Sequence, residues 1–123
     1  MRFALLLHNG VPDPGQVSDE DMADMQRLFG EYADALTRAG VLVGADILTA
    51  PGDARTVTRR TGETQVQDGP FAETKEALAG VFVVDVPDAD AALAWAERCP
   101  ASSYGTIEVR PAATSIVDGA WTA

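Results

Sequence analysis

Cysteine, histidine, lysine and long hydrophobic runs are all scarce in this sequence of 123 residues, and each scarcity excludes a class of protein. The single cysteine, Cys99, cannot form an internal disulfide, and the sequence has no cluster of Cys and His residues for a zinc site. The first apolar run, residues 3–7, is five residues long, whereas a secretory signal core needs about 7 to 15 and a membrane span about 20. We therefore expect a cytoplasmic protein that binds neither a metal ion nor a membrane.

Positive charge is scarce as well. Nine Lys and Arg residues against nineteen Asp and Glu give a net charge of −10. Because binding to nucleic acid requires a basic surface, we expect no nucleic-acid partner. The sequence also lacks a nucleophile elbow, a phosphate-binding loop and a dinucleotide fingerprint, so we expect no cofactor. What remains is proton-transfer chemistry or binding alone.

The pattern of residues predicts two amphipathic helices. Ser18 is a good N-cap, acidic residues follow it in the first turn, and apolar residues then recur three and four positions apart between residues 22 and 36. This stripe, which includes Met22 and Met25, is expected to pack in the core, and Gly40 suits the left-handed position that ends a helix. A second, shorter helix is predicted with Asp88 as its N-cap.

Apolar and β-branched runs predict four strands, at residues 2–7, 41–48, 80–86 and 104–110, and residues 55–60 and 64–67 form a polar hairpin. A short helical turn is expected at residues 73–78. The order of elements is that of an α+β, ferredoxin-like fold, in which two helices cover one face of an antiparallel sheet. The other face would expose apolar side chains, so we expect a homodimer, a dimeric α+β barrel. Residues 1–111 form the domain, and residues 112–123 are a C-terminal tail, mobile or wrapped around a partner.

Residues 66–80, VQDGPFAETKEALAG, resemble the signature of the DGPF-domain proteins, a branch of the YCII-related family. The similarity continues through the second predicted helix to IEVRP at residues 107–111. It implies a dimeric α+β barrel in which the DGPF loop lines a cleft. It also implies a regulatory link, because many members lie beside extracytoplasmic-function sigma factors. A catalytic His/Asp pair has been proposed for the wider family, with the His on the first helix, but the only histidine here, His8, ends the first strand.

Two ionisable side chains are the candidate catalytic residues. Asp68 precedes Gly69 and Pro70, which restrict the backbone, and a desolvated carboxylate there could act as a general base. His8 is the only side chain that ordinarily titrates near neutral pH, and it lies beside a loop rich in Gly and Pro. The alternative is structural: Asp68 caps the turn, Phe71 fills the core and His8 bonds to the backbone.

Phe71, Glu73 and Lys75 are the candidate substrate-binding residues at the wall of the same cleft. An acid and an amine two positions apart could bind a carboxylate or carbonyl group, or could form a surface ion pair worth at most about 1 kcal/mol.

The candidate residues are compatible with two functions. One is a cofactor-free lyase or isomerase that transfers a proton on a small molecule. The other is a regulatory module that senses a small molecule or binds a protein such as a sigma factor.

Overall fold

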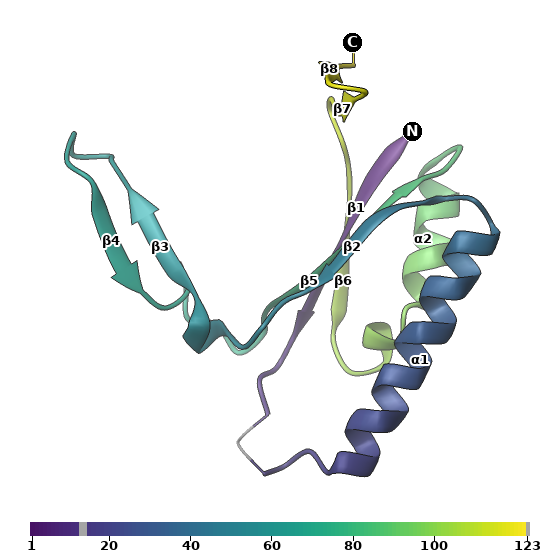
Figure 1. Ribbon diagram of the computed structural model, residues 1–123, viewed down its shortest axis with the longest axis horizontal. Coiled ribbons are helices and arrows are strands. Elements are labelled where there is room, and N and C mark those ends of the chain that lie inside the picture. The colour runs from purple at the N-terminus through teal and green to yellow at the C-terminus, as the bar shows by residue number, and fades with distance from the viewer. Residues whose placement is uncertain (13–14, 123) are drawn as a thin grey trace.

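The computed structural model describes residues 1–12 and 15–122 (Figure 1). Two helices lie on one side of a four-stranded antiparallel sheet, and a separate two-stranded hairpin projects away from them. The α+β architecture predicted from the sequence is therefore confirmed. The elements, in chain order, are β1 (Arg2–Asn9), α1 (Asp19–Arg38), β2 (Leu42–Ile47), η1 (Pro51–Asp53), β3 (Arg55–Thr58), β4 (Gln65–Asp68), β5 (Ala77–Asp85), α2 (Ala89–Arg98), η2 (Pro100–Ser103), β6 (Thr106–Pro111), β7 (Ile116–Val117) and β8 (Ala120–Trp121).

The four-stranded sheet has the order β2-β5-β1-β6, which makes β1 a central strand. Side chains alternate along β1, so that Phe3, Leu5 and Leu7 are buried in the core shared with the helices. The intervening residues lie on the opposite side of the sheet, which we call the open face. The apolar side chains that β1 and the facing part of β5 place there are half-buried: Ala4, Leu6, Val81 and Val83.

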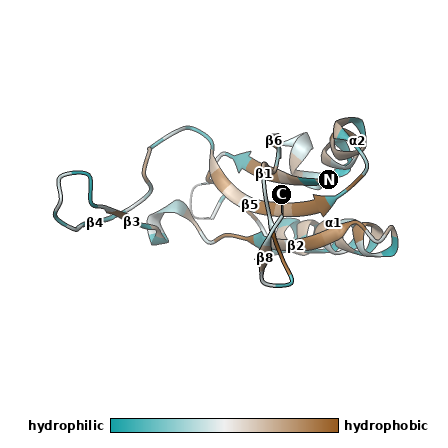
Figure 2. Cartoon of the chain, turned by 90° about the horizontal axis from the view of Figure 1, so that it is seen from above, coloured by the Kyte–Doolittle hydropathy of each residue, from teal (hydrophilic) through white to brown (hydrophobic). Residues whose placement is uncertain are grey.

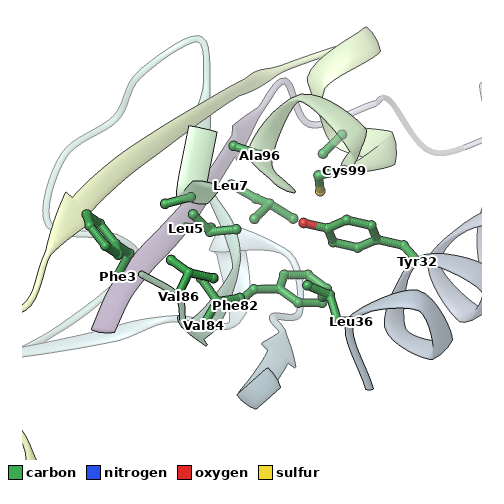
Figure 3. Close-up of a cluster of buried hydrophobic side chains, with 12 residues drawn as sticks. Phe3, Leu5, Leu7, Tyr32, Leu36, Phe82, Val84, Val86, Ala96 and Cys99 are labelled. Atoms are coloured by element: carbon green, nitrogen blue, oxygen red, sulfur yellow. The ribbon is translucent and has the colours of Figure 1, made fainter. Parts of the chain in front are cut away.

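A hydrophobic core joins the sheet to both helices (Figure 3). Tyr32 of α1 contacts the ring of Phe82 of β5 edge-on, with the ring centroids 5.2 Å apart. The Tyr32 hydroxyl donates a hydrogen bond of 2.8 Å to the carbonyl oxygen of Trp95 on α2. Burial raises the pKa of Tyr32 well above its ordinary value, so the hydroxyl stays protonated and can donate. Tyr32 thus connects both helices and the sheet.

Both helices begin at the capping residues that the sequence predicts. The Ser18 hydroxyl accepts a hydrogen bond of 3.1 Å from the Asp21 N–H, and the Asp88 carboxylate accepts one of 2.9 Å from the Ala91 N–H. Gly40 follows α1 with a φ of 72°, a left-handed conformation that glycine adopts without strain. Within the described residues, no helix is long and apolar enough to cross a membrane.

The segment before β5 differs from the prediction. Residues 73–78 do not form a helical turn: residues 73–76 are irregular, with a bend at residues 75–76, and β5 begins at Ala77. Pairing with the end of β1 is the reason, because Leu78 lies opposite His8 and Ala77 lies opposite Asn9. The last residues of the loop therefore become the first residues of a central strand.

The C-terminal segment forms a small hairpin over part of its length. Asp118 and Gly119, with φ values of 51° and 81°, make the two-residue turn between β7 and β8. Its expected wrapping around a partner stays a prediction.

The polar hairpin predicted from the sequence is present as β3 and β4, and we call residues 55–68 the arm. Its strands pair with each other and with no other described strand. The arm extends away from the sheet and helices (Figure 1), and it is mostly hydrophilic where β5 is mostly hydrophobic (Figure 2). Its strand residues are exposed except for the half-buried Thr56. The arm therefore contributes surface and not core.

Candidate functional site

Two large cavities open at the end of the sheet where β1 and β2 stop and β5 begins. The first, of about 610 Å³, is lined by His8, by the connection that follows β2 and by the DGPF loop, and we call it the His8 cavity. The second, of about 910 Å³, is lined by α1 and by the same strand ends, and we call it the helix-side cavity. Leu48 and Ala50 line both, so the two spaces are neighbours.

His8 lies on the open face, in the alternation that places Ala4 and Leu6 there, and a bulge after Leu7 shifts its pairing with β5. Its Nε2 atom is 3.2 Å from the Oε1 atom of Glu108, and both side chains are partly exposed. Gly105, which comes just before β6, lies so close to the end of β1 that a Cβ atom on it would clash with the His8 carbonyl oxygen. The end of β1 is thereby held against β6.

Glu108 is the residue of this site that the sequence-based interpretation missed. On β6, Glu108 lies opposite Leu6 and Thr106 lies opposite His8, so Glu108 and His8 are diagonal neighbours on one face. The alternation of Thr106, Glu108 and Arg110 was visible in the sequence. Only the pairing of β6 with β1 brings that carboxylate to the histidine. The Nε atom of Arg110 is also 3.9 Å from the Oε2 atom of Glu108.

Asp68 lies at the end of β4, at the base of the arm. Its side chain is 91% exposed, and its Oδ1 atom is 3.5 Å from the Nε atom of Arg55 on the paired strand. Gly69 has a φ of 98°, and its N–H donates a hydrogen bond of 2.7 Å to the Ala54 carbonyl oxygen. This bond ties the turn to the residue before β3 and does not involve the Asp68 carboxylate, and Asp68 is not among the residues that line the His8 cavity. A shared cleft for Asp68 and His8 stays a prediction.

Phe71 does line the His8 cavity, but the prediction that it fills the core is wrong, because its side chain is 83% exposed. The guanidinium carbon of Arg60 is 5.9 Å from its ring centroid. Thr74 and Glu76 line the cavity next to it, whereas Glu73 and Lys75 are exposed and not among its lining residues.

The helix-side cavity has a different lining. The first half of the α1 stripe contributes Met22, Met25 and Phe29, and the strand ends contribute Leu7 and Ile47. The prediction that the stripe packs in the core therefore holds only for its second half: Met22 is exposed on the wall of the cavity. In residues 1–12 and 15–122, no group of three or more His, Cys, Asp or Glu side chains is placed to hold a metal ion.

Comparison with known proteins gives one consistent result. The model of the YCII-related domain matches residues 1–114. An uncharacterised protein of Rhizobium meliloti (strain 1021) is 35% identical over 115 residues, which cover 92% of this chain and 93% of that relative. Residues 1–114 include His8, Glu108, the DGPF loop and the lining residues of both cavities.

Proposed function

The chain belongs to the YCII-related family, and we propose that it is a homodimeric, cofactor-free enzyme that transfers a proton on a small molecule. The reaction would be that of a lyase or an isomerase. The observation that carries the proposal is the hydrogen-bonded pair of His8 and Glu108 beside a cavity of about 610 Å³. A cavity of this size accommodates a small organic substrate.

The chemistry of the pair follows from its hydrogen bond. An ionised carboxylate only accepts hydrogen bonds, so the Nε2 atom of His8 must carry the proton when it contacts Glu108. The lone pair is then on Nδ1, which becomes the basic atom of the ring. Glu108 would fix this tautomer and stabilise the imidazolium that forms after proton abstraction. His8 is thus the proposed acid-base residue, and Glu108 is its positioning residue.

The open face supports the homodimeric part of the proposal. Its apolar residues from β1 and β5 are continuous with His8 and Glu108, which lie on the same face. A second copy on this face would cover the apolar strands and reduce the access of water to the His8–Glu108 pair. Exclusion of water strengthens electrostatic interactions in a site.

Exchange of carbon-bound hydrogen with solvent tests the proposal directly. The protein is incubated in D2O with a panel of small ketones, β-keto acids and unsaturated lactones, and deuterium uptake is followed by NMR. We expect uptake by at least one compound, a loss of about 10²-fold or more in His8→Gln and a smaller loss in Glu108→Gln. Asp68→Asn is the matched control that removes a carboxylate outside the cavity lining.

Three results would contradict the proposed proton-transfer activity of His8. These are no uptake by any compound with the wild type, unchanged uptake in His8→Gln, or a loss in Asp68→Asn as large as that in His8→Gln. The last would move the proton transfer to Asp68.

A regulatory, protein-binding role is the second candidate, and the arm favours it. The arm carries Arg55, Arg59 and Arg60 against two acidic residues, a net charge of +1 on a chain of −10. Val57 and Val66 face each other across it and are both exposed. An extracytoplasmic-function sigma factor is the partner that the family resemblance suggests. Calorimetric titration of such a factor into the wild type and into a variant with residues 58–65 replaced by Asn-Gly tests this role, and equal affinity for both would contradict it.

A further inference from the structure

The helix-side cavity lies on the opposite side of the sheet from His8. Leu7, which lines it, is buried on the helix side of β1, whereas the next residue, His8, belongs to the open face. Met22, Met25 and Phe29 form its wall on α1. The acid-base pair of the proposed enzyme therefore takes no part in this space.

Exposed apolar side chains gather around this cavity. Met22 on α1, Ile47 at the end of β2, Leu48 after it and Tyr104 before β6 are all exposed, and all four line the same space. Single exposed apolar residues are normal on a protein surface. Four of them from separate parts of the chain around one concave space are typical of a ligand site.

The polar groups of the lining define the chemistry of the ligand. They are the amides of Asn9 and Gln26, the hydroxyl of Tyr104 and the carboxylate of Asp21. No lysine, arginine or histidine is among the lining residues, and the whole chain carries a charge of −10, so no cationic side chain there compensates an anion. Although the Tyr104 side chain is 46% exposed, partial desolvation raises the pKa of its hydroxyl, which stays neutral and able to donate a hydrogen bond.

We propose that the helix-side cavity is a binding site for an uncharged, largely apolar small molecule. Its volume of about 910 Å³ is in the range of sites for drug-sized ligands. The flexible thioethers of Met22 and Met25 can adjust to the shape of such a ligand and contact its aromatic edges. The amides and the Tyr104 hydroxyl would orient a carbonyl or hydroxyl group of the ligand.

Two dyes with one aromatic skeleton test the proposal. N-phenyl-1-naphthylamine is uncharged, and 8-anilino-1-naphthalenesulfonate adds a sulfonate to the same rings. We expect saturable, one-to-one fluorescence enhancement with the uncharged dye and at least tenfold weaker binding of the sulfonate. We expect His8→Gln to leave the affinity for the uncharged dye unchanged, so dye binding can be measured separately from catalysis.

Matched variants place the dye in the cavity. Met22→Glu puts a carboxylate on a lining residue that is 51% exposed, and Leu93→Glu puts one on α2, at a residue that is 54% exposed and not among the lining. We expect at least a tenfold loss of affinity in the first and none in the second. If Met22→Glu fails to fold, Ile47→Glu replaces it, with Val43→Glu on the same strand as its control.

Four outcomes would overturn the proposal. They are no binding of the uncharged dye, equal or tighter binding of the sulfonate, equal affinity in Met22→Glu and Leu93→Glu, or dye binding that appears only on dilution to monomers. The last would show that a second copy of the chain covers the cavity. Absence of deuterium exchange in the wild type would contradict the proposed enzyme and leave the dye result unaffected, so the two proposals are tested separately.

Discussion

Phe71 carries the most exposed large apolar side chain in the described part of the protein. We expect Phe71→Ala to lower the free energy of unfolding by less than about 1 kcal/mol, since exposed positions contribute little to stability. Phe82→Ala, which removes a buried ring from β5, should cost about 3–5 kcal/mol. Urea denaturation followed by circular dichroism measures both. A loss in Phe71→Ala as large as that in Phe82→Ala would show that Phe71 is covered in solution.

Ionisation of Tyr32 should lower the stability of the protein at alkaline pH. Its pKa in the folded state is raised by burial, while in the unfolded chain it is about 10. The folded state therefore retains a proton that the unfolded state releases, so this contribution is full below about pH 10 and is lost as the pH rises through the raised value. The urea midpoint should fall between pH 10 and 11 more steeply in the wild type than in Tyr32→Phe. Parallel curves would contradict this assignment.

The residues of the candidate site were only partly predictable from the sequence. The DGPF loop and His8 could be selected because a restricted turn and a lone histidine are local features. Which residues of the loop line the cavity depends on the path of an irregular segment, in which Thr74 and Glu76 are lining residues and Glu73 is not. Glu108 could be found only from the pairing of β6 with β1, a contact between residues 100 positions apart.

At the level of elements, we expect the arm to contribute little to the stability of the domain. At the base of the arm, the two residues that flank it are joined by a hydrogen bond from the Gly69 N–H to the Ala54 carbonyl oxygen, and its strands pair with no other described strand. We expect replacement of residues 58–65 by Asn-Gly to leave the thermal unfolding temperature of the domain within a few degrees of the wild type. Circular dichroism on heating measures it. Loss of a cooperative transition would show that the arm is part of the folding unit.

The helices and strands themselves were predictable because their signals are local. Ser18 and Asp88 cap the helices as their side chains indicate, and the β-branched run of β5 forms a central strand. The turn expected at residues 73–78 did not form because the last two residues, Ala77 and Leu78, pair with β1, which is far away in the sequence. Helix propensity there was too weak to compete with two new positions in a sheet ladder.

For the whole molecule, net charge and apolar surface have opposite effects on the association of two copies. The net charge of −10 makes two copies repel each other, whereas the apolar side chains of the open face favour association. Salt screens the repulsion and leaves the burial of apolar surface in place. Association between copies should therefore become tighter as the salt concentration rises, opposite to what a dimer held by ion pairs would show.

Sedimentation velocity measures that association. At low micromolar concentration we expect a species of about twice the chain mass of 12.9 kDa. Val81→Glu places a carboxylate in the middle of the open face and should give a folded monomer, because an unpaired charge would be buried between the sheets. Leu93→Glu, on the exposed side of α2, should remain a dimer. A monomeric wild type, or equal dimerisation of both variants, would show that the open face is not where two copies meet.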